Sequence, residues 1–150
     1  MMRVAFAALH LLALGIGLGA VWARARGLRG PSPLDAASLR RVFYADSLWG
    51  VSAIVWIATG LARVFASMEK STAYYMQNSL FWTKMTLLAL ILVLEIRPML
   101  TFIRWRAQLA KGETPDTTSA GSLATTSTVQ ALIVITMVFV AAAMARGFGA

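Results

Sequence analysis

Four stretches of largely apolar residues constrain this chain more than any other feature. They cover residues 4–23, 43–66, 80–103 and 123–145. Each is about as long as the 20 or so residues that an α-helix needs to cross the hydrocarbon core of a bilayer. The composition agrees, since 59% of the 150 residues are hydrophobic and only 13% are charged, whereas soluble domains carry about a quarter charged residues. We therefore predict an all-α fold: an integral membrane four-helix bundle that forms one domain over residues 1–150.

The first stretch also has some features of a signal peptide. Arg3 precedes it, and small residues that suit a cleavage site lie near its end, at Gly19-Ala20 and at Ala23-Arg24-Ala25. Its apolar part is longer than an ordinary signal-peptide core, and three further stretches follow it. We favour a first helix that is retained in the membrane.

The basic residues between the stretches predict the orientation of the bundle. Lys and Arg are frequent in the connections 24–42 and 104–122, and sparse at the N-terminus, in the connection 67–79 and at the C-terminus. Connections rich in Lys and Arg stay in the cytoplasm. We therefore expect a multi-pass protein of the bacterial inner membrane with both termini on the outer side. The net charge of +8 then indicates contact with the lipid bilayer and its anionic lipids rather than with nucleic acid.

Ionisable residues inside the stretches are costly and need partners or a function. Lys84 and Glu95 are eleven residues apart on one helix, so they share a face but are separated by roughly 16 Å of helix rise. Each must therefore find its partner on another helix. We predict an inner polar cluster of Asp46, Glu95 and Arg97, in which Asp46 caps a helix or pairs with Arg40 or Arg97.

A second polar zone is predicted toward the outer side, and it is basic. It comprises His10, Arg63 and Lys84. Aromatic and amide side chains lie beside it as candidate outer-face contacts: Tyr74, Tyr75, Asn78 and Trp82. Interior cations without matching acids suit an anionic guest, such as the propionates of a tetrapyrrole or a lipid phosphate.

His10 supports two interpretations. Gly17 lies on the same helix face and either serves close helix packing or leaves a slot for a flat cofactor. An intramembrane His can ligate haem iron, and it can equally bond to a neighbouring helix. Thiolate metal sites are excluded because the chain has no Cys, and a single His with scattered Met residues argues against copper transport.

These residues resemble a bacterial family of predicted four-helix membrane proteins with no assigned function. The resemblance covers nearly the whole chain, and its most specific part is the segment from Tyr74-Tyr75 through Asn78 and Phe81-Trp82 to Lys84. It also includes His10, Asp46, Gly50, Gly60, Arg63, Lys70, Pro98 and the run Arg104-Trp105-Arg106.

A more distant resemblance is to the membrane-embedded, haem-containing protoporphyrinogen oxidases and the copper-resistance membrane proteins. In the oxidase group a His on the first helix and a Lys on a later helix matter for haem and activity. His10 and Lys84 occupy the corresponding places, so the resemblance implies haem b as a cofactor, with His10 as its iron ligand.

Three functions follow as hypotheses. The leading one is a small membrane protein with a binding or accessory role, in which His10, Gly17, Arg63 and Lys84 hold haem b. The second is a membrane redox enzyme of the protoporphyrinogen oxidase type, in which His10 and Lys84 act as acid–base groups. The third is a structural subunit of a homo-oligomer or a larger membrane complex. The sequence leaves open whether the protein is an enzyme.

Overall fold

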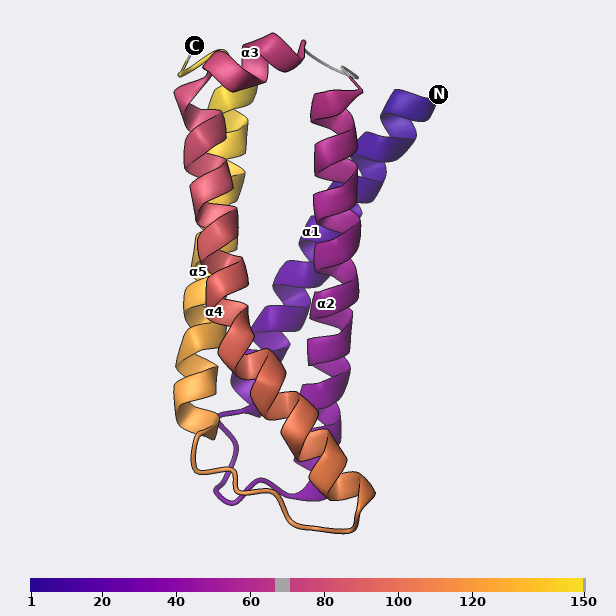
Figure 1. The fold of residues 1–150 in the computed structure, drawn as a ribbon, viewed down its shortest axis with the longest axis vertical. Helices are drawn as coiled ribbons and strands as arrows, with labels where there is room; N and C mark the ends of the chain where they lie inside the picture. Colours follow the sequence, from indigo (N-terminus) through magenta and orange to yellow (C-terminus); the bar gives the residue numbers. More distant parts are fainter. Residues whose placement is uncertain (67–70, 150) are drawn as a thin grey trace.

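The computed structural model describes residues 1–66 and 71–149, and its described part is helical with short connections. The helices are α1 (Met2–Gly27), α2 (Ala36–Phe65), α3 (Thr72–Gln77), α4 (Ser79–Ala110) and α5 (Ala120–Ala145) (Figure 1). All but α3 are long and apolar enough to cross a membrane. For these residues the prediction of an all-α chain with four long apolar helices is confirmed, and each of the four long helices overlaps one of the predicted apolar stretches. Lys70, part of the motif above, lies outside the described residues.

Polar side chains define where the helices begin. Asp35 accepts a hydrogen bond from the backbone N–H of Ser38 at 2.7 Å at the start of α2. Asn78 does the same for α4, accepting from the N–H groups of Leu80 at 2.9 Å and Phe81 at 3.2 Å. These bonds satisfy amides that have no partner within the helix. The short helix α3 was not predicted, because six residues are too few for hydrophobic periodicity to reveal a helix.

The long helices form two pairs. Helix α1 packs along α2, α4 packs along α5, and α1 also contacts α5. Both termini and α3 lie at one end of the bundle, the termini end, where the two pairs stand apart (Figure 1). The connections 28–35 and 111–119 lie at the opposite end, the loop end. There α4, which contains Pro98, changes direction and crosses in front of α1 and α2 (Figure 1); a proline inside a helix is a common cause of such a bend.

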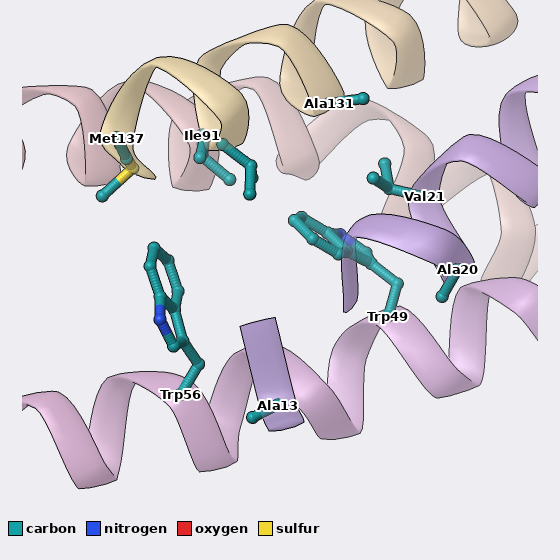
Figure 2. Close-up of a cluster of buried hydrophobic side chains, with 9 residues drawn as sticks. Ala13, Ala20, Val21, Trp49, Trp56, Ile91, Ala131 and Met137 are labelled. Atoms are coloured by element: carbon teal, nitrogen blue, oxygen red, sulfur yellow. The ribbon is translucent and has the colours of Figure 1, made fainter. Parts of the chain in front are cut away.

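The central core is a cluster of buried apolar residues from all four long helices. Trp49 and Trp56 of α2 face Ile91 of α4 and Met137 of α5 across it (Figure 2). In contrast, only 17–28% of the most apolar window of each span is buried, and large residues such as Phe139, at 71% exposure, point outward. An apolar exterior around a thin core is what lipid-facing helices require.

Candidate functional site

Arg24 of α1 is the centre of a polar network that joins the four long helices. Its side chain is fully buried, and its five N–H groups are all used. Nη1 donates to Asp46 Oδ1 at 2.9 Å and to Glu95 Oε1 at 2.7 Å. Nη2 donates to Glu95 Oε2 at 2.9 Å and to Gln130 Oε1 at 2.7 Å, while Nε donates to Ser127 Oγ at 3.1 Å. The guanidinium is therefore saturated by partners on α2, α4 and α5.

Glu95 of α4 is satisfied in the same way. Its carboxylate accepts the bidentate hydrogen bonds from Arg24. In addition, Oε2 accepts from Trp49 Nε1 at 3.1 Å and from Gln130 Nε2 at 2.7 Å. Gln130 also donates to the carbonyl of Ile91 at 3.3 Å. A partly buried carboxylate with this many donors is compensated for the water it has lost. We use the name Arg24 cluster for the side chains joined in this network: Arg24, Asp46, Trp49, Glu95, Arg106, Ser127 and Gln130.

Asp46 has a second cationic partner. Arg106 Nη2 donates to Asp46 Oδ2 at 2.9 Å, to the carbonyl of Phe43 at 3.0 Å and to Ser47 Oγ at 3.2 Å. The sequence analysis placed Asp46 and Glu95 in one inner cluster, and the structure brings them together. It places Arg97 elsewhere: this side chain is exposed and donates to Ser122, because it projects from the other side of α4. Arg40, the other expected partner of Asp46, is also exposed.

The second polar region is a cavity at the termini end, between the two helix pairs. It encloses about 720 Å³, and every helix contributes to its lining. Ligand sites typically occupy about 300–1,000 Å³. Arg3, Arg63 and Lys84 line it together with His10. The described part of the lining combines these cationic groups and the rings of Tyr74 and Tyr75 with apolar side chains. We call it the termini-end cavity.

His10 of α1 is held in the cavity wall by α2. Its Nδ1 lies 2.9 Å from Thr59 Oγ1, and the Thr59 hydroxyl points its own proton at the carbonyl of Val55, 2.7 Å away. We therefore assign the His10 proton to Nδ1, as the donor to Thr59. Gly60 makes room for the ring, since a Cβ at this position would lie 3.1 Å from His10 Cε1.

Trp56 of α2 forms the floor of the cavity. It is only 9% exposed, His10 stacks on its ring with centroids 5.6 Å apart, and Lys84 Nζ lies over the ring at 5.8 Å from the centroid. The indole N–H is buried and has no hydrogen-bond partner. Such unsatisfied donors are uncommon in native structures and call for an explanation.

The remaining predicted site residues divide into two groups. Tyr74 and Tyr75 line the cavity beside Arg63 and Lys84. Gly17, Asn78 and Trp82 do not line it. Each of these three residues makes a structural contact elsewhere in the bundle.

Gly17 permits close packing of α1 on α2, because a Cβ there would lie 3.2 Å from Ser52 Cβ. The space expected for a flat cofactor beside Gly17 is thus taken by side chains of α2. Asn78 is buried and binds the carbonyl of Phe148 at 3.0 Å. Trp82 is exposed and donates to the carbonyl of Met76.

Two residues that matter most in the structure, Arg24 and Trp56, were missed by the sequence analysis. Arg24 was assigned to a connection, whereas α1 continues to Gly27. The available signal was the spacing: His10, Gly17 and Arg24 follow one another at steps of seven on one face of α1. Trp56 likewise lies seven residues before Arg63 on α2.

The chain matches, over residues 2–149, the family described as predicted membrane protein DUF2214. It belongs to this family. The expected resemblance to a family of predicted membrane proteins is thereby confirmed, and the protein is a multi-pass DUF2214 membrane protein. No curated protein and no solved structure matches the chain, so the more distant resemblance to haem-containing oxidases stays a prediction. In residues 1–66 and 71–149 of this DUF2214 protein, no three His, Asp or Glu side chains gather into a metal site.

Proposed function

We propose that this protein binds an anionic amphiphile inside the bilayer, in the termini-end cavity. The observation that carries the proposal is the lining: Arg3, Arg63 and Lys84 face the same space as apolar residues. Cations in a low-dielectric wall favour an anion far more than cations in water do. The apolar part of the wall suits a hydrocarbon or a flat ring system.

The location of the cavity supports a ligand drawn from the membrane. It lies between helices that are otherwise surrounded by lipid, and some of its lining residues, such as Leu11 at 63% exposure, also face the lipid. An amphiphile can therefore place its anionic group among the cations and its apolar body along the exposed helix faces. The Arg24 cluster, in contrast, has saturated hydrogen bonds and serves to join the helices.

Native mass spectrometry of the protein released from a mild detergent tests this proposal. The wild type should retain one anionic molecule, and Arg63→Met should lose it. Arg104→Met is the matched control, because Arg104 is an exposed arginine near the loop end. A wild type that carries no anionic ligand, or equal retention by Arg63→Met and Arg104→Met, would overturn the proposal.

Haem b is a second candidate for the same cavity, and the His10 geometry favours it. A haem-ligating His usually donates its other ring N–H to an acceptor, as His10 does to Thr59. His10 would hold the iron, Arg63 and Lys84 would neutralise the propionates, and the haem would supply redox chemistry. Protein purified from haem-sufficient cells should then show a Soret band that His10→Ala abolishes. A colourless preparation refutes haem binding and leaves a lipid phosphate or carboxylate as the anionic group.

A further inference from the structure

The buried indole N–H of Trp56 indicates where the anionic group of the ligand lies. We infer that Trp56 Nε1 and Lys84 Nζ form an oxyanion subsite at the floor of the termini-end cavity, which takes a carboxylate or phosphate group. This inference rests on the proposed binding function and adds the chemistry and the depth of the recognised group.

The first support is the state of the Trp56 donor. Trp56 is 9% exposed, and its Nε1 makes no hydrogen bond. A buried donor without an acceptor costs about 1–3 kcal/mol. Trp49 lies seven residues earlier on α2 in the same core, and its indole N–H is satisfied because Nε1 donates to Glu95. An acceptor oxygen from a ligand would satisfy Trp56 as Glu95 satisfies Trp49.

The second support is the direction of the donor. The lining residues of α2 run from Trp56 to Val64, so the cavity lies on the termini-end side of Trp56. Figure 2 shows the indole nitrogen of Trp56 on the edge of the ring turned away from Trp49, which is that same side. The ring face is stacked by His10, so Trp56 meets a ligand through its N–H edge.

The third support is the neighbouring positive charge. Lys84 lines the same cavity and holds its ammonium 5.8 Å from the centre of the Trp56 ring. A group with two acceptor oxygens can accept from an N–H donor and from an ammonium that line the same cavity. Carboxylates and phosphate esters both provide such a pair. His10 gives its Nδ1 proton to Thr59, so we assign it no hydrogen bond to the anion.

The depth of this subsite distinguishes it from ordinary lipid contact. Trp56 lies nine residues before the end of α2 at Phe65, which corresponds to roughly 13 Å of helix. Headgroups of bulk lipid lie at the interface, outside the hydrocarbon core. A ligand whose anionic group reaches Trp56 is therefore taken into the protein, with Arg63 and Arg3 nearer the surface to attract it.

Probe binding to the purified protein in phosphatidylcholine nanodiscs tests the inference. The probes are oleate for the carboxylate, oleoyl lysophosphatidic acid for the phosphate, and methyl oleate as the uncharged reference. Trp56→Phe removes the N–H and keeps an aromatic ring, and Trp82→Phe is the matched control because Trp82 is exposed and already bonded to Met76.

We expect Trp56→Phe to weaken binding of the preferred anionic probe about tenfold or more, with no change for methyl oleate. Trp82→Phe should bind like the wild type. The anionic probe with the greater affinity identifies the recognised group as carboxylate or phosphate. Equal affinities of Trp56→Phe and Trp82→Phe would overturn the inference.

Lys84→Met provides a second test should Trp56→Phe fail to fold. Its matched control is Lys111→Met, an exposed lysine near the loop end. We expect Lys84→Met to lower the affinity for the anionic probe and to leave methyl oleate unaffected. If the wild type binds the probe and Arg63→Met weakens it while Trp56→Phe and Lys84→Met do not, only the subsite is wrong. If the wild type binds neither anionic probe, the proposed function itself fails.

Discussion

Replacement of Arg24 by Met should destabilise the bundle more than any other single change to a charged residue. The substitution keeps the length of the aliphatic stem but removes five hydrogen bonds and the positive charge. Among the described residues, Glu95 then keeps the N–H groups of Trp49 and Gln130, and Asp46 keeps Arg106 as a cationic partner.

The expected magnitude follows from the burial of the network. Removing one partner of a buried ion pair costs about 3–5 kcal/mol, because the remaining charge is left uncompensated. The side chains of Asp46 and Glu95 are 15% and 21% exposed, so we expect the lower end of this range. Arg24→Lys should fall between Met and the wild type, since an ammonium has three donors and cannot form the two-pronged bond to Glu95. Arg97→Met is the control, and an exposed arginine should change the free energy of unfolding by about 0.5 kcal/mol or less.

Unfolding in dodecyl maltoside micelles, driven by added sodium dodecyl sulfate and followed by tryptophan fluorescence, measures these differences. Should Arg24→Met fail to accumulate in the membrane, Glu95→Gln provides a milder loss in the same cluster. The reasoning is refuted if Arg24→Met or Glu95→Gln unfolds with the same free energy as Arg97→Met.

Three further predictions concern packing, capping and orientation. Gly60→Ala should lower stability and ligand binding because its Cβ would press on the neighbouring imidazole, whereas Gly50→Ala, which meets no atom within 4 Å, should be neutral or slightly stabilising in the same unfolding assay. The side-chain and backbone hydrogen bonds at the start of α2 hold the pKa of Asp35 below its ordinary value; its contribution to stability is therefore present above the unfolded-state pKa of about 3.9 and is lost as the pH falls through the folded-state pKa. Unfolding of the wild type and of Asp35→Ala between pH 3 and pH 6 should show that the variant lacks this part of the acid dependence, and parallel profiles would contradict it. Because the chain has no Cys, single introduced cysteines report the orientation of the bundle. If the termini are outside, a membrane-impermeant maleimide should label Gln77→Cys in intact cells and should label Glu113→Cys only after the cells are opened. The reverse labelling pattern would show the opposite topology.

The helices were predictable from the sequence because lipid permits few solutions. A chain with four long apolar stretches must satisfy its backbone inside each span, which leaves helices. The helices are longer than the predicted apolar stretches: α2 begins at Ala36, before residue 43, and α4 extends to Ala110, beyond residue 103. Hydropathy detects the hydrocarbon-facing part of a helix, whereas amphipathic ends such as the one that carries Arg106 continue beyond it.

The side-chain contacts inside the bundle were harder to predict, because they depend on which helices pack against each other. Spacing on α4 showed that Lys84 and Glu95 each need a partner from another helix. It did not show that Glu95 would meet Arg24, since Arg24 lay beyond the predicted end of the first span. Sequence reasoning placed His10, Arg63 and Lys84 in one zone, and all three line the termini-end cavity. The missing partner of the Trp56 N–H is visible only in three dimensions.

The central claim, that the termini-end cavity holds an anionic amphiphile, is tested most directly by photocrosslinking in native membranes. A benzophenone amino acid at Ala141 faces the cavity, and the same group at Ile54, which is 70% exposed on α2, faces bulk lipid. Mass spectrometry of the adducts should show one dominant anionic amphiphile at Ala141 and the mixture of membrane lipids at Ile54. Identical adducts at the two positions would contradict the claim.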